Sequence, residues 1–92
     1  MAEISVKLPS LLAHAAGGAR RIDVSGESLR EALDDLKHRY PAVATHLFDE
    51  AGDFREHVLC FLNETNTRWL DSLEHPLSNG DTIVMLQAVS GG

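Results

Sequence analysis

The sequence predicts an α+β domain in which a mixed β-sheet carries one principal helix on one of its faces. Two observations support this fold class: strand-like apolar segments occur in both halves of the chain, and a single long amphipathic helical segment lies between them. A length of 92 residues suits one domain, residues 1–92, with a small core. Because the helix packs on one side of the sheet, the other side is expected to face water or a partner.

The N-terminal segment is predicted to form a β-hairpin with a long loop. Its first strand alternates apolar and polar residues and ends at Pro9, with the apolar positions at Ile4, Val6 and Leu8. Gly17-Gly18 then turns the chain into a second strand over residues 20–24, in which Ile22 and Val24 are expected to point inward.

The principal helix is predicted to begin at a capping box, in which Ser28 and Glu31 satisfy each other's backbone N–H groups. Its apolar residues follow the spacing of an amphipathic helix: Leu29, Ala32, Leu33, Leu36 and Tyr40. Pro41 ends the helix, and residues 42–48 favour a further helical turn. The acidic pairs Asp34-Asp35 and Glu27/Glu31 are interpreted as solvated charges on or beside the exposed helix face.

Three more strands are predicted in the second half of the chain. A loop at residues 49–53, with Gly52 as the breaker, precedes a strand at 58–62. A turn at 63–67 then leads to a short strand at 68–70, and the last strand occupies 82–87. The resulting order is β-β-α-β-β-β.

Composition and charge exclude several classes of function. The net charge of −6 disfavours nucleic acids and anionic membranes as partners and favours proteins with basic surfaces. No apolar run approaches the roughly 18 residues that span a membrane. The N-terminus lacks the pattern of a signal peptide, and one cysteine cannot form an internal disulfide, so a cytoplasmic location is expected.

The C-terminal residues are the strongest indication of function. Gly91 and Gly92 have no Cβ, so they can pass through a channel too narrow for a side chain. An extended tail from Ala88 to Gly92 reaches roughly 17 Å beyond the last strand. Because an α-carboxylate is an anion at neutral pH and a poor electrophile, it needs activation. On the residues alone, this segment either presents a terminal carboxylate to the active site of a partner or is a frayed terminus of small residues. The expected flexible tail consists of Ala88, Val89, Ser90, Gly91 and Gly92.

This order of elements resembles the ubiquitin-like β-grasp sulfur carrier family (MoaD/ThiS-like) over essentially the whole chain. The resemblance rests on two segments, His75-Pro76-Leu77-Ser78-Asn79-Gly80-Asp81 before the last strand and Ala88-Val89-Ser90-Gly91-Gly92 after it. The stretch from Asn63 to Leu70 is most similar to the cysteine-biosynthesis (CysO-type) carriers. One departure is Gln87, where many members have a proline that stiffens the exit of the tail.

The resemblance implies a β-grasp fold and a sulfur carrier that is a protein cosubstrate, not an enzyme. An E1-like adenylyltransferase would use ATP to adenylate the Gly92 carboxylate, which would become a thiocarboxylate. A sulfur-accepting synthase would then receive the sulfur for cysteine, a cofactor or a secondary metabolite. The carrier itself would bind no cofactor, and a processing metalloprotease is implied where the gene encodes residues beyond Gly92. Two alternatives remain open: the small subunit of molybdopterin synthase, and a ubiquitin-like modifier conjugated to lysines through Gly92.

The cysteine and the histidines are the other candidates for a functional site. Cys60 lies in mid-strand, where alternation places it on the inner face with Val58 and Leu62, so we interpret it as structural and not as a catalytic thiol. The five histidines show no zinc-ligand spacing, and no metal site is expected: His14, His38, His46, His57 and His75.

An apolar docking surface is predicted on the open face of the sheet. If Ile83 and Met85 point inward, Val84 and Leu86 point outward beside two residues of the neighbouring strand. The predicted docking surface for the activating enzyme therefore consists of Leu59, Phe61, Val84 and Leu86.

Overall fold

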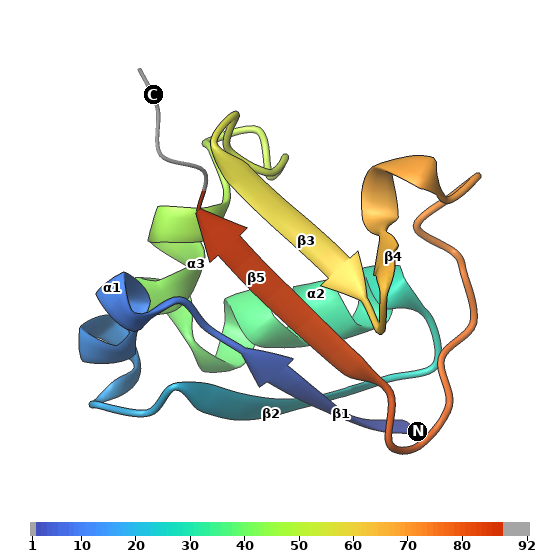
Figure 1. Cartoon of the computed structure of the whole chain (residues 1–92), viewed down its shortest axis with the longest axis horizontal. Helices are drawn as coiled ribbons and strands as arrows, with labels where there is room; N and C mark the ends of the chain where they lie inside the picture. The colour runs from blue at the N-terminus through green and yellow to red at the C-terminus, as the bar shows by residue number, and fades with distance from the viewer. Residues whose placement is uncertain (1, 88–92) are drawn as a thin grey trace.

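The computed structural model describes residues 2–87, which form a five-stranded mixed sheet in the order β2-β1-β5-β3-β4 (Figure 1). β5 pairs in parallel with β1, and the other neighbouring strands are antiparallel. The last strand in sequence therefore lies at the centre of the sheet. The strands are β1 (Ala2–Lys7), β2 (Arg21–Gly26), β3 (Val58–Leu62), β4 (Thr65–Asn66) and β5 (Thr82–Gln87).

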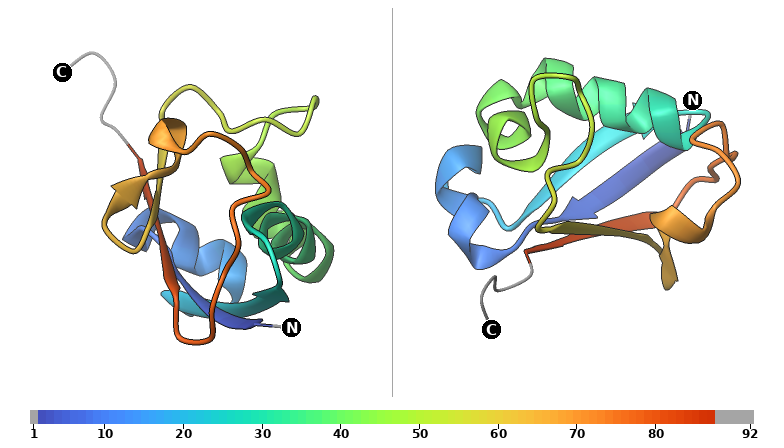
Figure 2. Two further views of the ribbon diagram at one scale, coloured as in Figure 1. Left: turned by 90° about the vertical axis from the view of Figure 1, so that its right-hand side faces the viewer. Right: turned by 90° about the horizontal axis from the view of Figure 1, so that it is seen from above.

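Helices cover one face of this sheet, as Figure 2 shows in its right-hand view. The principal helix is α2 (Leu29–Arg39), and Pro41 both ends it and begins α3 (Pro41–Leu47), because proline suits the first turn of a helix. The predicted α+β class and the helical turn after Pro41 are confirmed. The loop of the N-terminal hairpin contains α1 (Ser10–Ala13) and the short 3₁₀ helix η1 (His14–Ala16).

The core lies between the sheet and the helices, and the predicted inward positions are confirmed. In β1, β3 and β5 the residues at alternate positions are buried, apart from Ala2 and Gln87 at strand ends. The apolar stripe of α2 is buried as well. The buried strand residues include Ile4, Val6, Ile22, Val24, Val58, Cys60, Leu62, Ile83 and Met85. The buried helix residues include Leu29, Ala32, Leu33, Leu36, Val43 and Leu47.

Only half of the predicted capping box forms at the start of α2. The Ser28 hydroxyl accepts a hydrogen bond from the Glu31 amide at 3.2 Å. The Glu31 carboxylate instead accepts from the amide of Glu27 at 2.9 Å. The predicted hydrogen bond from the Ser28 amide to the Glu31 carboxylate is therefore wrong, because the donor is the amide of the preceding residue, Glu27.

The loop of residues 70–81, before β5, supplies the remaining hydrogen bonds to the start of α2. The Leu29 amide donates to the His75 carbonyl at 2.9 Å, and the Arg30 amide donates to the Leu73 carbonyl at 2.8 Å. These two amides have no carbonyl partner inside the helix. The loop thus completes the hydrogen bonding of α2 and is held beside it.

The prediction of a short strand at residues 68–70 is wrong. Strand β4 comes earlier, at Thr65–Asn66, and residues Thr67–Trp69 form the 3₁₀ helix η2. Asn63 adopts a left-handed conformation with φ of 56°, which allows a two-residue connection from β3 to β4. The Asn66 side chain then accepts from the Arg68 amide at 2.9 Å and starts the helical turn.

Asp35 is not the solvated charge that the sequence predicted, because it joins α2 to β2. Its carboxylate accepts from the backbone amide of Ser25 at 2.8 Å and from Arg39 Nε at 3.1 Å. The two elements approach closely here, since a Cβ on Gly26 would lie 2.5 Å from the Ala32 backbone nitrogen. The charged residue therefore has a structural role at a tight contact.

Cys60 is buried on the inner face of β3, where its Cα pairs with that of Met85. Burial raises the pKa of the Cys60 thiol from 9.0 to about 12, and a hydrogen bond with the Thr67 side chain opposes part of this rise. The thiol is consequently protonated at neutral pH, and its predicted position in the core is confirmed.

We expect Asp35→Ala to lower the free energy of unfolding by about 1–3 kcal/mol, because it leaves the amide of buried Ser25 without an acceptor. The neighbouring Asp34→Ala is the matched control, since Asp34 is exposed and its change should stay within about 0.5 kcal/mol. Urea unfolding of both variants measures the difference. Equal losses would contradict the role of Asp35.

We expect the stability advantage of the wild type over Cys60→Ala to be about 1 kcal/mol at neutral pH. This advantage should shrink as the pH rises above 9.0, where the thiol ionises in the unfolded chain. In the folded protein the pKa of the thiol is about 12, so ionisation favours the unfolded chain. Urea unfolding of both proteins between neutral and alkaline pH measures it. A difference that does not change with pH would contradict the burial of this thiol.

Candidate functional site

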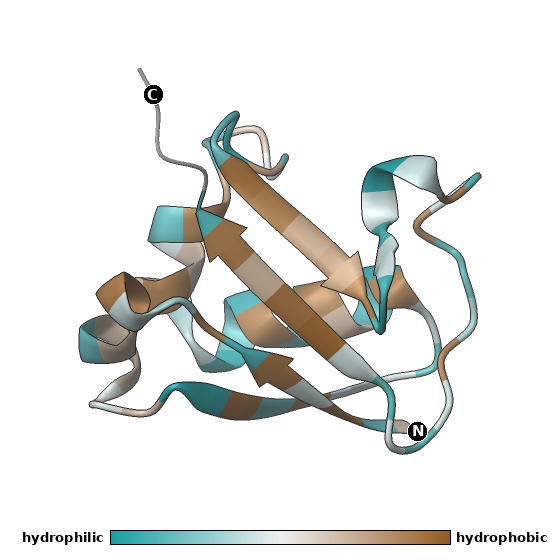
Figure 3. Ribbon diagram, in the orientation of Figure 1, coloured by the Kyte–Doolittle hydropathy of each residue, from teal (hydrophilic) through white to brown (hydrophobic). Residues whose placement is uncertain are grey.

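The outer face of β3 and β5 carries the four apolar residues that the sequence predicted to lie together. Leu59 lies opposite Leu86 and Phe61 lies opposite Val84, so their side chains are cross-strand neighbours. Leu86 is 43% exposed, and the other three are half-buried. Figure 3 shows these two strands as an apolar region in the middle of the sheet. We call these four residues the apolar patch; its docking role stays a prediction.

The predicted reactive tail starts next to this patch. Gln87 is the last residue that the structure describes, and it follows Leu86 directly. The tail residues lie outside the described residues: Ala88, Val89, Ser90, Gly91 and Gly92. Since Ala88 is bonded to Gln87, a protein that binds the patch has the beginning of the tail within its reach.

The structure adds two basic residues to this face that the sequence analysis missed. Lys7 pairs with Val84 of the patch across the parallel β1–β5 contact, and it lies opposite Arg21 of β2. Both basic side chains are exposed. Alternation along β1 indicated that Lys7 faces away from the core. The order of the strands, which places Lys7 beside the patch, was not readable from the sequence.

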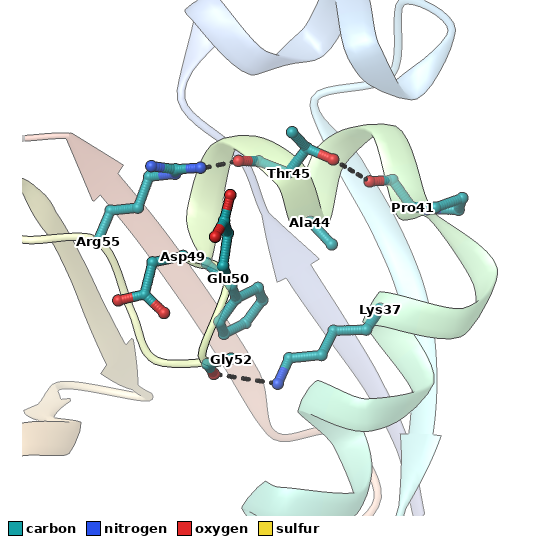
Figure 4. Close-up of a pocket in the computed structure, with 9 residues that line it drawn as sticks. Lys37, Pro41, Ala44, Thr45, Asp49, Glu50, Gly52 and Arg55 are labelled. Carbon is teal, nitrogen blue, oxygen red and sulfur yellow. Dashed lines mark hydrogen bonds between the residues drawn. The ribbon is translucent and has the colours of Figure 1, made fainter.

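A hollow of about 330 Å³ lies on the helix side, between α2, α3 and the loop after α3 (Figure 4). Its two basic side chains both donate to backbone carbonyls: Lys37 Nζ to Gly52 at 3.1 Å and Arg55 Nε to Thr45 at 3.0 Å. Lys37 Nζ also lies 4.4 Å from the centre of the Phe48 ring. These contacts hold the loop against the helices, so we assign the hollow a structural role.

The described residues offer no evident centre for chemistry. Within residues 2–87, no group of three His, Cys, Asp or Glu side chains is placed to hold a metal ion. The expectation that the chain binds no metal stays a prediction. Cys60 is buried on the inner face, so its thiol is not exposed on the outer face, and this burial raises the pKa of the thiol. None of the helices in the described part of the chain is long and apolar enough to cross a membrane.

Comparison with known proteins identifies relatives of similar length. The chain is 28% identical over 91 residues to the sulfur carrier protein CysO of Mycobacterium tuberculosis, covering 97% of this chain and 98% of that protein. It resembles the solution structure of small archaeal modifier protein 1 from Methanosarcina acetivorans, with a TM-score of 0.83, 34% identity, and coverage of 100% and 98% of the two chains.

A third relative was solved together with another protein. The crystal structure of the Amycolatopsis orientalis BexX/CysO complex contains a chain that matches with a TM-score of 0.81 and 27% identity, covering 97% of this chain and 99% of that one. The shared fold is the ubiquitin-like β-grasp that the resemblance implied. The model of the ThiS family matches residues 6–92, which include the whole sheet apart from the first residues of β1. The chain therefore belongs to the ThiS family.

Proposed function

We propose that this protein is a sulfur carrier whose Gly92 carboxylate is activated and converted to a thiocarboxylate. One observation carries the proposal: the ThiS family match extends to residue 92 and so includes the diglycine. The similarity to the sulfur carrier protein CysO over nearly the full length of both chains supports the same role. The carrier is a protein cosubstrate, and its folded part presents the tail to other proteins.

The proposed chemistry takes place at the terminal carboxyl group. A carboxylate oxygen of Gly92 attacks the α-phosphorus of ATP in an E1-like adenylyltransferase, and pyrophosphate leaves. Sulfide then displaces AMP from the acyl adenylate, which leaves a thiocarboxylate with a nucleophilic sulfur. ATP is bound by the enzyme, and the carrier holds no cofactor. Because this activation consumes ATP, we place the protein in the cytoplasm.

The tail and the apolar patch have separate roles in this proposal. Gly91 and Gly92 enter the narrow active site, since they lack a Cβ, while Ala88, Val89 and Ser90 span the distance from the sheet. The apolar patch of Leu59, Phe61, Val84 and Leu86 docks on the activating enzyme. Its proximity to Gln87 and the exposure of Leu86 support this assignment.

Other partners follow from the same role. A sulfur-accepting synthase takes the sulfur from the thiocarboxylate, and the solved complex of BexX with a CysO relative supports a partner protein of this class. A processing metalloprotease acts only where the gene encodes residues after Gly92.

One alternative has a specific observation in its favour. The 34% identity to small archaeal modifier protein 1 favours a ubiquitin-like modifier that is conjugated to lysines through Gly92. Conjugate ladders in a cell lysate would support the modifier role. The other alternative is a small subunit of molybdopterin synthase. Co-purification of a stable complex with a large subunit would support it.

We expect incubation with the cognate activating enzyme, ATP and sulfide to replace one carboxylate oxygen of Gly92 by sulfur, as measured by intact mass. Deletion of Gly92 should abolish this change and leave the melting temperature unaltered, because the core lies within residues 2–87. Gly91→Ala should slow activation, whereas Ser90→Ala is the tail control that should not. Sulfur donation at the normal rate without Gly92 would contradict the proposal.

We expect Phe61→Ala or Leu86→Ala to weaken binding of the activating enzyme at least about tenfold, as truncation of interface hot spots does. Leu86→Ala should hardly change the melting temperature, since Leu86 is 43% exposed. Trp69→Ala is the control, because Trp69 is 78% exposed on η2 and is not part of the patch. η2 follows β4, which pairs with the end of β3, whereas Gln87 pairs with Val58 at the start of β3. Adenylation kinetics with melting curves test this, and unchanged activation would remove the patch from the mechanism.

A further inference from the structure

A single row of outward side chains crosses four neighbouring strands of the sheet. Arg21 on β2 lies opposite Lys7 on β1, Lys7 lies beside Val84 on β5, and Val84 lies opposite Phe61 on β3. Residues paired in this way project from the same face of the sheet. The row therefore begins with two positive charges and continues directly into the apolar patch.

The two positive charges are an unfavourable pair within the isolated chain. Directly opposite side chains have Cβ atoms roughly 4.5–5.5 Å apart, and like charges at this separation destabilise a sheet. The ion pairs found within residues 2–87 are Arg39–Asp35 and Arg30–Glu74, and neither involves Lys7 or Arg21.

Acidic residues are plentiful in this chain, yet none lies directly opposite the basic pair. The chain has 14 acidic and 8 basic residues. The neighbouring acidic residue on β2 is Asp23, which is diagonal to Lys7 and on the same face as Arg21. Asp23 is in neither of the two ion pairs found within residues 2–87. The positive charge at the edge of the patch is thus left available to a partner.

We propose that Lys7, Arg21 and the apolar patch form one docking face, and that the activating enzyme meets it with carboxylates beside an apolar surface. This inference rests on the proposed function and specifies the chemistry of the partner. It differs from the expectation of a basic partner that the net charge of −6 suggested. Net charge acts on the approach of a partner over long distances, whereas the contact itself depends on the charges on the docking face.

The test compares charge reversals on this face with a matched reversal elsewhere. Lys7→Glu and Arg21→Glu together should raise the dissociation constant for the activating enzyme at least about tenfold in low salt, with a smaller effect in high salt. Arg68→Glu is the control for the effect of reversing a charge outside the docking face, because Arg68 is exposed on η2 and its reversal should change binding less than about twofold. Titration calorimetry at two salt concentrations, with a melting curve for each variant, gives the readout.

The possible outcomes separate this inference from the proposed function. If Phe61→Ala weakens binding and the double reversal does not, the apolar patch stands and the acidic partner surface is overturned. Tighter binding of the double reversal would show a basic partner surface and would also overturn it. A wild-type protein that does not bind the activating enzyme would overturn both proposals together. If the double reversal fails to fold, Lys7→Gln with Arg21→Gln removes the same charges and should weaken binding in the same direction.

Discussion

The structure depends on the insertion of β5, the last strand, between β1 and β3. This insertion joins residues 5–7 to residues 82–84 in a parallel contact and joins both to the β3–β4 hairpin. Its register sets the direction of every side chain on the strand, because a slip of one residue would exchange the two faces. Ile83 and Met85 then complete the core, and Val84 and Leu86 remain outside.

The two faces of the sheet consequently have different uses. The inner face is filled by α2 and α3, and even the potentially reactive thiol of Cys60 serves there as a buried apolar group. The outer face is left uncovered by the described helices and is where a partner has access (Figure 2). Alternate residues of the same strand therefore belong to the core and to the proposed docking surface, as Cys60 and its neighbour Leu59 illustrate.

The proposed reaction needs little from the folded part beyond position. In the proposed reaction, a carboxylate that is activated by another enzyme requires no base or metal on the carrier. The central place of β5 brings Val84 of the apolar patch beside Lys7, and Leu86 of the patch directly precedes Gln87, the last described residue. In this proposal, β5 contributes Val84 and Leu86 to the docking surface and leads directly into the tail that reacts.

The sequence by itself determined the features that depend on local periodicity and on residue chemistry. Alternation in β3 and β5 identified both faces, the spacing in α2 identified its buried stripe, and the diglycine with its flanking segments indicated the family. Only the tertiary structure decided the contacts between distant segments. It placed Lys7 beside Val84, joined Asp35 to the Ser25 amide, and moved β4 ahead of the predicted position through the turn at Asn63. These outcomes depend on which strands pair and in what register, and a local pattern contains no information about a partner many residues away.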